Sequence, residues 1–177
     1  MKKNFKIAAI LMIIAAVCGL AVSGMNKVTS GIIERNQAEK EAALFKEIFT
    51  EYDIDHSQII TEGFSNEAIT KKVVAKDDSG ALLGNIYTVS KKNMYGPISL
   101  LVGINAEGKL VSIEFLENGQ TGGKNVDVEN HVDSNYKAGL TASDIANIDT
   151  NCGATKGANT VKELVTIAFN DYNGGAK

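Results

Sequence analysis

The hydrophobic and polar positions of the chain form three successive patterns. Residues 7–25 are an apolar run that contains no charged residue. In residues 27–49, apolar positions recur mostly every three or four residues between charged ones, which is the period of an amphipathic helix. Short β-rich runs follow, and a second helical pattern occupies residues 157–172. Together the patterns predict a long N-terminal helix followed by a small α+β domain.

The apolar run is just long enough to span a bilayer. As a helix, residues 7–25 would rise about 28 Å at roughly 1.5 Å per residue, against a hydrocarbon core of about 30 Å. Lys2, Lys3 and Lys6 precede the run and favour a cytoplasmic N-terminus. We therefore expect a single-pass protein of the cell (inner) membrane. The expected parts are a basic end and transmembrane helix (1–25), an amphipathic stalk helix (26–50) and an outer or periplasmic domain (51–177).

Two other interpretations of the apolar run stay open. The run could belong to a cleaved signal peptide, because the small residues Ala21 and Ser23 stand before a possible cut. It could also belong to a lipoprotein modified at Cys18, although the bulky Val17 precedes that cysteine. All three interpretations place the rest of the chain outside the cytoplasm.

Four β-rich runs predict one antiparallel sheet. They occupy residues 68–76, 81–90, 98–104 and 110–116. Residues 77–80 (DDSG) are strong turn formers between the first two runs, and residues 105–109 join the last two. For residues 130–148 we expect a loop with short helical pieces, and a turn or a short strand starting at 141–145. The helix at 157–172 is expected to pack on the sheet.

Composition and charge narrow the classes of function. All 21 acidic residues follow the apolar run, and no basic stripe interleaved with aromatic residues is present, so nucleic acid is not an expected partner. Cys18 lies within the apolar run and Cys152 near the C-terminus, so the two are not expected to meet in a disulfide. No cysteine cluster indicates zinc or iron–sulfur, and no metal site is expected. His56 and His131 are both predicted to be surface residues.

Residues 149–156 (DTNCGATK), just before the last helix, hold the candidate chemistry. The start of a helix offers free N–H groups and the positive end of the helix dipole, which suit a phosphate. Gly153 and Ala154 leave room for a bulky group, Lys156 adds positive charge, and Thr155 offers a hydroxyl. Alternatively, Thr155 is only a helix cap. Because residues 160–163 also fit a capping box, the start of the helix stays open.

Two further features allow both a functional and a plain interpretation. The Gly-rich segment 117–125 (ENGQTGGKN) follows a predicted strand, where it is either a loop that lets a ligand approach the backbone or an ordinary flexible turn. Cys152 precedes a helix, a position at which a thiol can serve as a catalytic nucleophile. The sequence pairs no base with this thiol, so we assign no catalytic residue.

The spacing of Asp149, Gly153, Ala154 and Thr155 resembles the flavinylation motif of the FMN-binding domain family. In that family a threonine hydroxyl is joined to FMN by a phosphoester bond, which a dedicated flavin transferase makes from FAD with Mg²⁺. Other segments resemble the family in the same order. These segments are residues 95–98 (YGPI), 102–109 (VGINAEGK), 115–117 (FLE) and the Gly-rich loop. The resemblance covers nearly the whole chain.

The resemblance implies one covalently bound FMN. The implied site residues are Thr155 as the attachment point, Cys152, Gly153, Ala154 and Lys156 around it, Asp149 in the motif, and Thr121 and Gly123 from the loop. Three positions depart from the family pattern. Cys152 replaces a usual Ser or Thr, Lys156 replaces a hydroxyl or apolar residue, and residues 120–123 read QTGG where the family usually has ETPG.

Within this family the chain resembles the G subunit of the Rnf electron-transport complex, a relative of the C subunit of the sodium-translocating NADH:quinone reductase. This resemblance implies an electron carrier in a complex that couples ferredoxin:NAD electron transfer to Na⁺ or H⁺ translocation, without turnover by this chain alone. Implied partners are the other membrane proteins of the complex, the flavin transferase and the lipid bilayer. The alternatives are a flavinylated domain of an extracellular reductase or redox sensor, and an anchored interaction domain without flavin.

Overall fold

The computed structural model describes residues 12, 15, 41 and 43–174. The chain divides into two compact units, Met1–Ala42 and Ala43–Lys177. Most of the first unit, with the predicted membrane helix and most of the predicted stalk, lies outside the described residues. Among the residues that are described, no helix has the length and apolar character that crossing a membrane requires.

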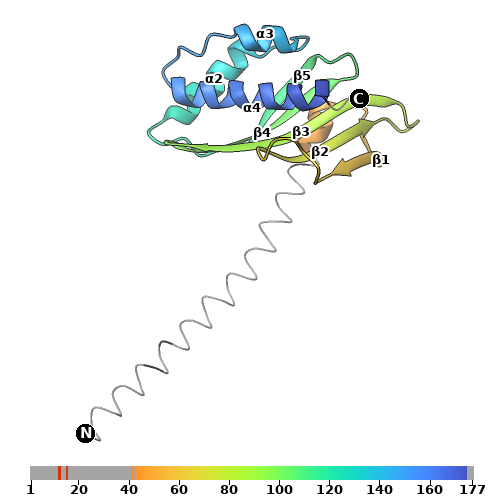
Figure 1. Cartoon of the computed structure of the whole chain (residues 1–177), viewed down its shortest axis with the longest axis horizontal. Coiled ribbons are helices and arrows are strands. Elements are labelled where there is room, and N and C mark those ends of the chain that lie inside the picture. Colours follow the sequence, from red (N-terminus) through yellow and green to blue (C-terminus); the bar gives the residue numbers. More distant parts are fainter. Residues whose placement is uncertain (1–11, 13–14, 16–40, 42, 175–177) are drawn as a thin grey trace, which may run out of the picture. The chain divides into compact units, whose positions relative to one another are not determined.

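A five-stranded antiparallel sheet forms the centre of the second unit (Figure 1). The strands lie side by side in chain order, so each pair of sequence neighbours is also hydrogen-bonded. They are β1 (Asp53–Ile60), β2 (Ile69–Lys76), β3 (Leu82–Asn93), β4 (Gly96–Asn105) and β5 (Leu110–Asn118). The α+β class is confirmed, and so are the four predicted strands, within a few residues of their predicted ends.

Strand β1 is the one strand of the described sheet that the sequence pattern does not predict. Its sequence, DIDHSQII, is polar, and most of its side chains are exposed. Because β1 lies at the edge of the sheet and buries little surface, packing does not require its residues to alternate between apolar and polar. Its pairing with β2 also shifts between Asp53 and Gln58. Backbone hydrogen bonding therefore defines this strand more than its side chains do.

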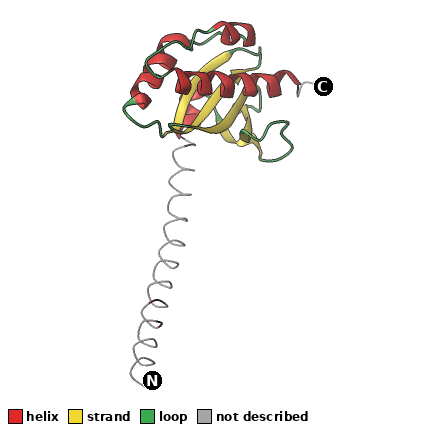
Figure 2. Cartoon of the chain, turned by 60° about the vertical axis from the view of Figure 1, so that its left-hand side comes forward, coloured by secondary structure: helices red, strands yellow, loops and turns green. Residues whose placement is uncertain are grey.

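Three described helices follow the sheet, namely α2 (Lys124–Asn135), α3 (Ala142–Asn147) and α4 (Thr155–Gly174). Helix α4 runs across one face of the sheet over β3 and β4, and α2 and α3 both contact it (Figures 1 and 2). The predicted C-terminal helix is thus confirmed and is slightly longer than predicted. The expectation of a turn or short strand at 141–145 is wrong. Thr141 and Asp144 form a capping box that starts α3 instead.

Apolar side chains are buried on both faces of the sheet. Adjacent strand residues point to opposite faces, so Leu100 and Val102 join the larger core beneath the helices while Leu101 joins a second core. Residues 43–48 are helical, and Phe45 and Ile48 pack in that second core. Because both faces are covered, consecutive residues are buried in the middle of β3 and β4.

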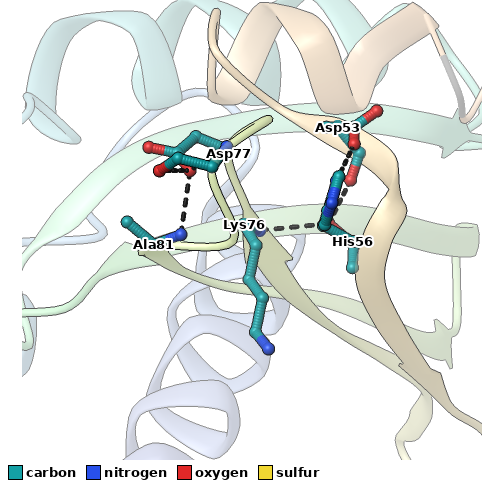
Figure 3. Close-up of polar contacts among 7 residues, drawn as sticks. Asp53, His56, Lys76, Asp77 and Ala81 are labelled. Carbon is teal, nitrogen blue, oxygen red and sulfur yellow. Dashed lines mark hydrogen bonds and ion pairs between the residues drawn. The ribbon is translucent and has the colours of Figure 1, made fainter.

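The hairpin between β2 and β3 is organised by Asp77 (Figure 3). Its Oδ1 accepts hydrogen bonds from the backbone N–H groups of Ser79 (2.9 Å) and Ala81 (2.8 Å), which confirms the predicted turn. The Ser79 hydroxyl donates to the same oxygen (2.6 Å) and, with the N–H of Ala81, lowers the pKa of Asp77. Nearby, the exposed His56 contacts Asp53, which raises the pKa of the histidine. His56 is thus a surface residue, as predicted.

Candidate functional site

A small pocket forms where three segments of the chain meet at the start of α4. The segments are the β3–β4 turn, the loop between β5 and α2 with the first residue of α2, and residues 153–157. The pocket has a volume of about 210 Å³. Its lining residues are Tyr95, Gln120, Lys124, Gly153, Ala154, Thr155, Lys156 and Gly157. The structure thus brings the predicted residues 153–156 together at one concave surface.

Thr155 is the first residue of α4, and its side chain is exposed at the pocket. Its Oγ1 donates a hydrogen bond to the carbonyl oxygen of Cys152 (2.8 Å). An N-cap side chain lies one residue before the helix and accepts from a backbone N–H, so this geometry is not that of a cap. The capping-box interpretation of residues 160–163 is wrong, because Thr160 lies inside α4 and donates to the carbonyl of Lys156 (2.9 Å).

Two glycines allow α2 to lie directly against the start of α4. A Cβ at Gly157 would lie 2.3 Å from Cγ2 of Val128, and one at Gly153 would lie 2.8 Å from Oδ2 of Asp127. Both distances are too short for non-bonded atoms. A larger residue at Gly157 therefore forces α2 and α4 apart, whereas one at Gly153 requires only that the partly exposed Asp127 side chain turn away.

Hydrogen bonds fasten the β3–β4 turn to the loop that follows β5. The N–H of Thr121 donates to the carbonyl of Tyr95 (2.9 Å), and the N–H of Gly119 donates to the carbonyl of Pro97 (2.9 Å). The side chain of Gln120 is buried and donates through Nε2 to the carbonyl of Gly96 (2.9 Å). The Gly-rich segment is therefore a fixed wall of the pocket rather than a free turn.

Asn93 connects this wall to α4. Its Nδ2 donates to Oε1 of Gln120 (3.1 Å) and to Oγ1 of Thr160 (3.0 Å). On the other side of the pocket, Nζ of Lys124 donates to the carbonyl of Gly153 (2.8 Å) and pairs with Asp127 (3.3 Å). The three segments around the pocket are thus held together by side-chain contacts as well as by packing.

The charge around the pocket suits an anion. Lys124 and Lys156 are among its eight lining residues, which include no carboxylate; Asp127, outside the lining, pairs with Lys124. The first turn of α4 contains no acidic residue either. The unpaired N–H groups and the positive dipole end of the helix add to the positive charge. The donor set, the small residues and the exposed hydroxyl therefore fit a phosphate ester at Thr155.

The other predicted site residues are not among those that line this pocket. Cys152 is half-buried and packs against the larger core. Asp149 accepts a hydrogen bond from the N–H of Asn151 (2.9 Å) and so shapes the turn before α4. Thr121 contributes its backbone, and Gly123 takes a left-handed conformation (φ 75°) just before α2. The direct roles of Thr121 and Gly123 toward a flavin stay predictions.

Sequence reasoning did not single out Tyr95, Gln120 and Lys124 as site residues. Tyr95 and Gln120 stand inside segments that resemble the family, but no spacing rule connects them to Thr155. The prediction of His131 as a surface residue is wrong. His131 belongs to α2 and its side chain is buried; this burial lowers its pKa, although the negative charge of Asp149 acts in the opposite direction. Among the described residues, no group of three or more potential metal ligands gathers.

Two family models match the chain. The FMN-binding domain matches residues 93–170, and the RnfG N-terminal region matches residues 1–48. No curated protein matches it. The first match includes the β3–β4 turn, the Gly-rich wall and the start of α4, and so contains every residue that lines the pocket. The class of protein is therefore a flavoprotein with an FMN-binding domain.

On the two matches together, the chain is an RnfG-like subunit of the Rnf complex. It is accordingly an FMN-binding electron-carrier subunit of a multi-subunit redox complex, for which the family suggests a membrane location. The resemblance to the G subunit of the Rnf complex, predicted from the sequence motifs, is thereby confirmed.

Proposed function

We propose that Thr155 carries a single FMN through a phosphoester bond and that the pocket at the start of α4 holds the phosphate. One observation carries the proposal: the exposed Thr155 hydroxyl stands at the mouth of a pocket lined by two lysines and no carboxylate. Gly153 and Ala154 lie directly before this hydroxyl and present almost no side chain to an incoming group. When bound, the flavin supplies one- and two-electron redox chemistry.

Attachment requires a group transfer at Thr155. Oγ1 bonds to the phosphorus of the FMN half of FAD, the diphosphate bond of FAD breaks, AMP leaves, and the hydroxyl proton passes to a base of the flavin transferase. In the structure Oγ1 uses its proton in the bond to the carbonyl of Cys152, so its lone pairs remain available. Exposure of the motif turn gives the transferase access, since Asp149, Asn151 and Gly153 are all exposed.

We further propose a setting for the protein. Residues 7–25 span the membrane with the N-terminus in the cytoplasm, a stalk follows, and the FMN-binding domain lies on the outer or periplasmic side. The complex couples ferredoxin:NAD electron transfer to the translocation of Na⁺ or H⁺, and this chain contributes the electron carrier. The match to the RnfG N-terminal region supports this role over that of a flavinylated domain of an extracellular reductase or sensor.

Denaturing gel electrophoresis tests the attachment. The full chain is co-expressed with a flavin transferase, and the gel is viewed under ultraviolet light. We expect a fluorescent band for the native chain, no band for Thr155→Val, and a band for the matched control Thr70→Val, whose exposed threonine lies on β2. A fluorescent band of equal intensity in Thr155→Val would refute the proposed site. Co-purification with multi-span membrane proteins of the complex distinguishes the Rnf role from a separate reductase or sensor.

A further inference from the structure

We propose that the side chain of Tyr95 is the surface on which the isoalloxazine ring of the FMN stacks. This inference rests on the proposed attachment at Thr155 and adds the residue that receives the other end of the nucleotide. Tyr95 belongs to the β3–β4 turn, far from Thr155 in sequence, and lines the same pocket.

The size of the pocket places the ring outside it. Pockets that enclose a whole small-molecule ligand usually have volumes of about 300–1,000 Å³. The pocket at Thr155 has about 210 Å³, which suits the phosphate and part of the sugar-alcohol chain. With the phosphate fixed at Thr155, the ring then lies against a residue at the rim.

Tyr95 is the one aromatic residue among the eight that line the pocket. The residue is 39% exposed, so part of it is accessible to a ligand at the pocket. The other lining residues are glycines, an alanine, a threonine, a glutamine and two lysines, none of which offers a flat apolar surface of comparable area. Aromatic rings stack in offset or edge-to-face arrangements, which an isoalloxazine satisfies at such a surface.

The backbone of Tyr95 is held on both sides although its side chain is exposed. Its N–H donates to Oδ1 of Asn93 (2.8 Å), and its carbonyl accepts from the N–H of Thr121 (2.9 Å). Asn93 in turn contacts Thr160 of α4, the helix that starts with Thr155. The backbone of Tyr95 and the first turns of α4 are therefore held in fixed relative positions, which lowers the entropy lost when a ligand contacts both segments.

The test uses the full chain, flavinylated by co-expression, and three variants. Tyr95→Phe keeps a flat ring but removes the phenol that quenches an excited flavin by electron donation. Tyr95→Ala removes the ring. Met94→Ala is the matched control, because Met94 is adjacent, 76% exposed and not among the pocket residues. For each protein we measure intact mass, visible circular dichroism of the flavin, and flavin emission before and after unfolding.

For the wild-type chain and Met94→Ala we expect emission that is quenched until unfolding and a visible dichroism band. Tyr95→Phe should keep the band but lose the quenching, and Tyr95→Ala should lose both, with the mass of attached FMN unchanged. Wild-type dichroism and quenching in both Tyr95 variants would overturn the stacking inference while leaving the attachment intact. If Tyr95→Ala is not flavinylated, the emission of Tyr95→Phe tests the inference by itself: unquenched emission supports stacking on Tyr95, and quenched emission overturns it. A wild-type chain without the added mass overturns the proposed function, and this inference with it.

Discussion

Replacing Gly157 with alanine tests the close contact between α2 and α4 that shapes the pocket. The added Cβ would lie 2.3 Å from Cγ2 of Val128 and 3.2 Å from Oε1 of Gln120. Val128 is fully buried in α2, where a valine side chain has one strongly preferred rotamer, so it cannot turn away. The substitution therefore forces the two helices apart.

The magnitude follows from two opposing effects. Overpacking a core typically costs about 1–3 kcal/mol. Alanine in place of glycine inside a helix gains about 0.5–1 kcal/mol. The two ranges combine to a net loss of about 0–2.5 kcal/mol. A value near the middle, about 1 kcal/mol, lowers Tm by roughly 3–5 °C for a unit of this size. Because Gly157 lines the pocket, flavinylation of the variant should fall as well.

Thermal unfolding followed by circular dichroism measures this loss. Gly174→Ala is the matched control, because it lies in the same helix and a Cβ there meets no atom within 4 Å. The double variant Gly157→Ala/Val128→Ala removes the clashing methyl group and should recover part of the stability relative to Val128→Ala alone. A Gly157→Ala protein that melts at or above the wild-type temperature would show that the two helices are not in tight contact.

Three further predictions concern contacts elsewhere in the unit. Lys124→Met removes the hydrogen bond to the carbonyl of Gly153. Since the lysine is partly exposed, the unfolding free energy should fall by only about 0.5–1.5 kcal/mol. The rate of flavinylation should also fall, and an unchanged rate would contradict the role of Lys124 at the pocket. His131 has a lowered pKa when folded, so stability should decline as the pH falls below about 6.5, where the unfolded chain binds the proton. His131→Gln should flatten this decline in Tm, measured from pH 7.5 to 5.5. The exposed His56 has a raised pKa and therefore adds stability as the pH falls, but it does so equally in the native chain and in the variant. Phe45→Ala should cost about 3–5 kcal/mol in urea unfolding because Phe45 is buried in the second core, whereas the exposed neighbour Lys46→Ala should have little effect. Equal effects of the last two substitutions would argue against packing of residues 43–48 on the sheet.

The elements that the sequence predicts are those with a buried face. Strands β2 to β5 and helix α4 bury many of their apolar residues, either in short runs or at helical spacing, and these patterns are visible in the sequence. Strand β1 buries little, so it leaves no such signal. The short helix α3 depends on one local capping box, which the pattern of apolar residues does not reveal.

The attachment side of the pocket is contiguous in sequence, and the opposite side is not. Gly153 to Lys156 could be recognised because a helix start, small residues and a hydroxyl follow one another within a few positions. Tyr95 and Gln120 reach the pocket only through pairing of the β3–β4 turn with the loop after β5. Burial of His131 likewise depends on how α2 packs, which its polar sequence does not indicate.

Peptide mapping by tandem mass spectrometry tests whether FMN is attached at Thr155. The chain is purified from cells that contain the transferase and is digested, and the fragment that carries FMN is sequenced. We predict a single modified peptide with the added mass on Thr155. A chain without a modified peptide, or FMN located on a different residue, would contradict the account.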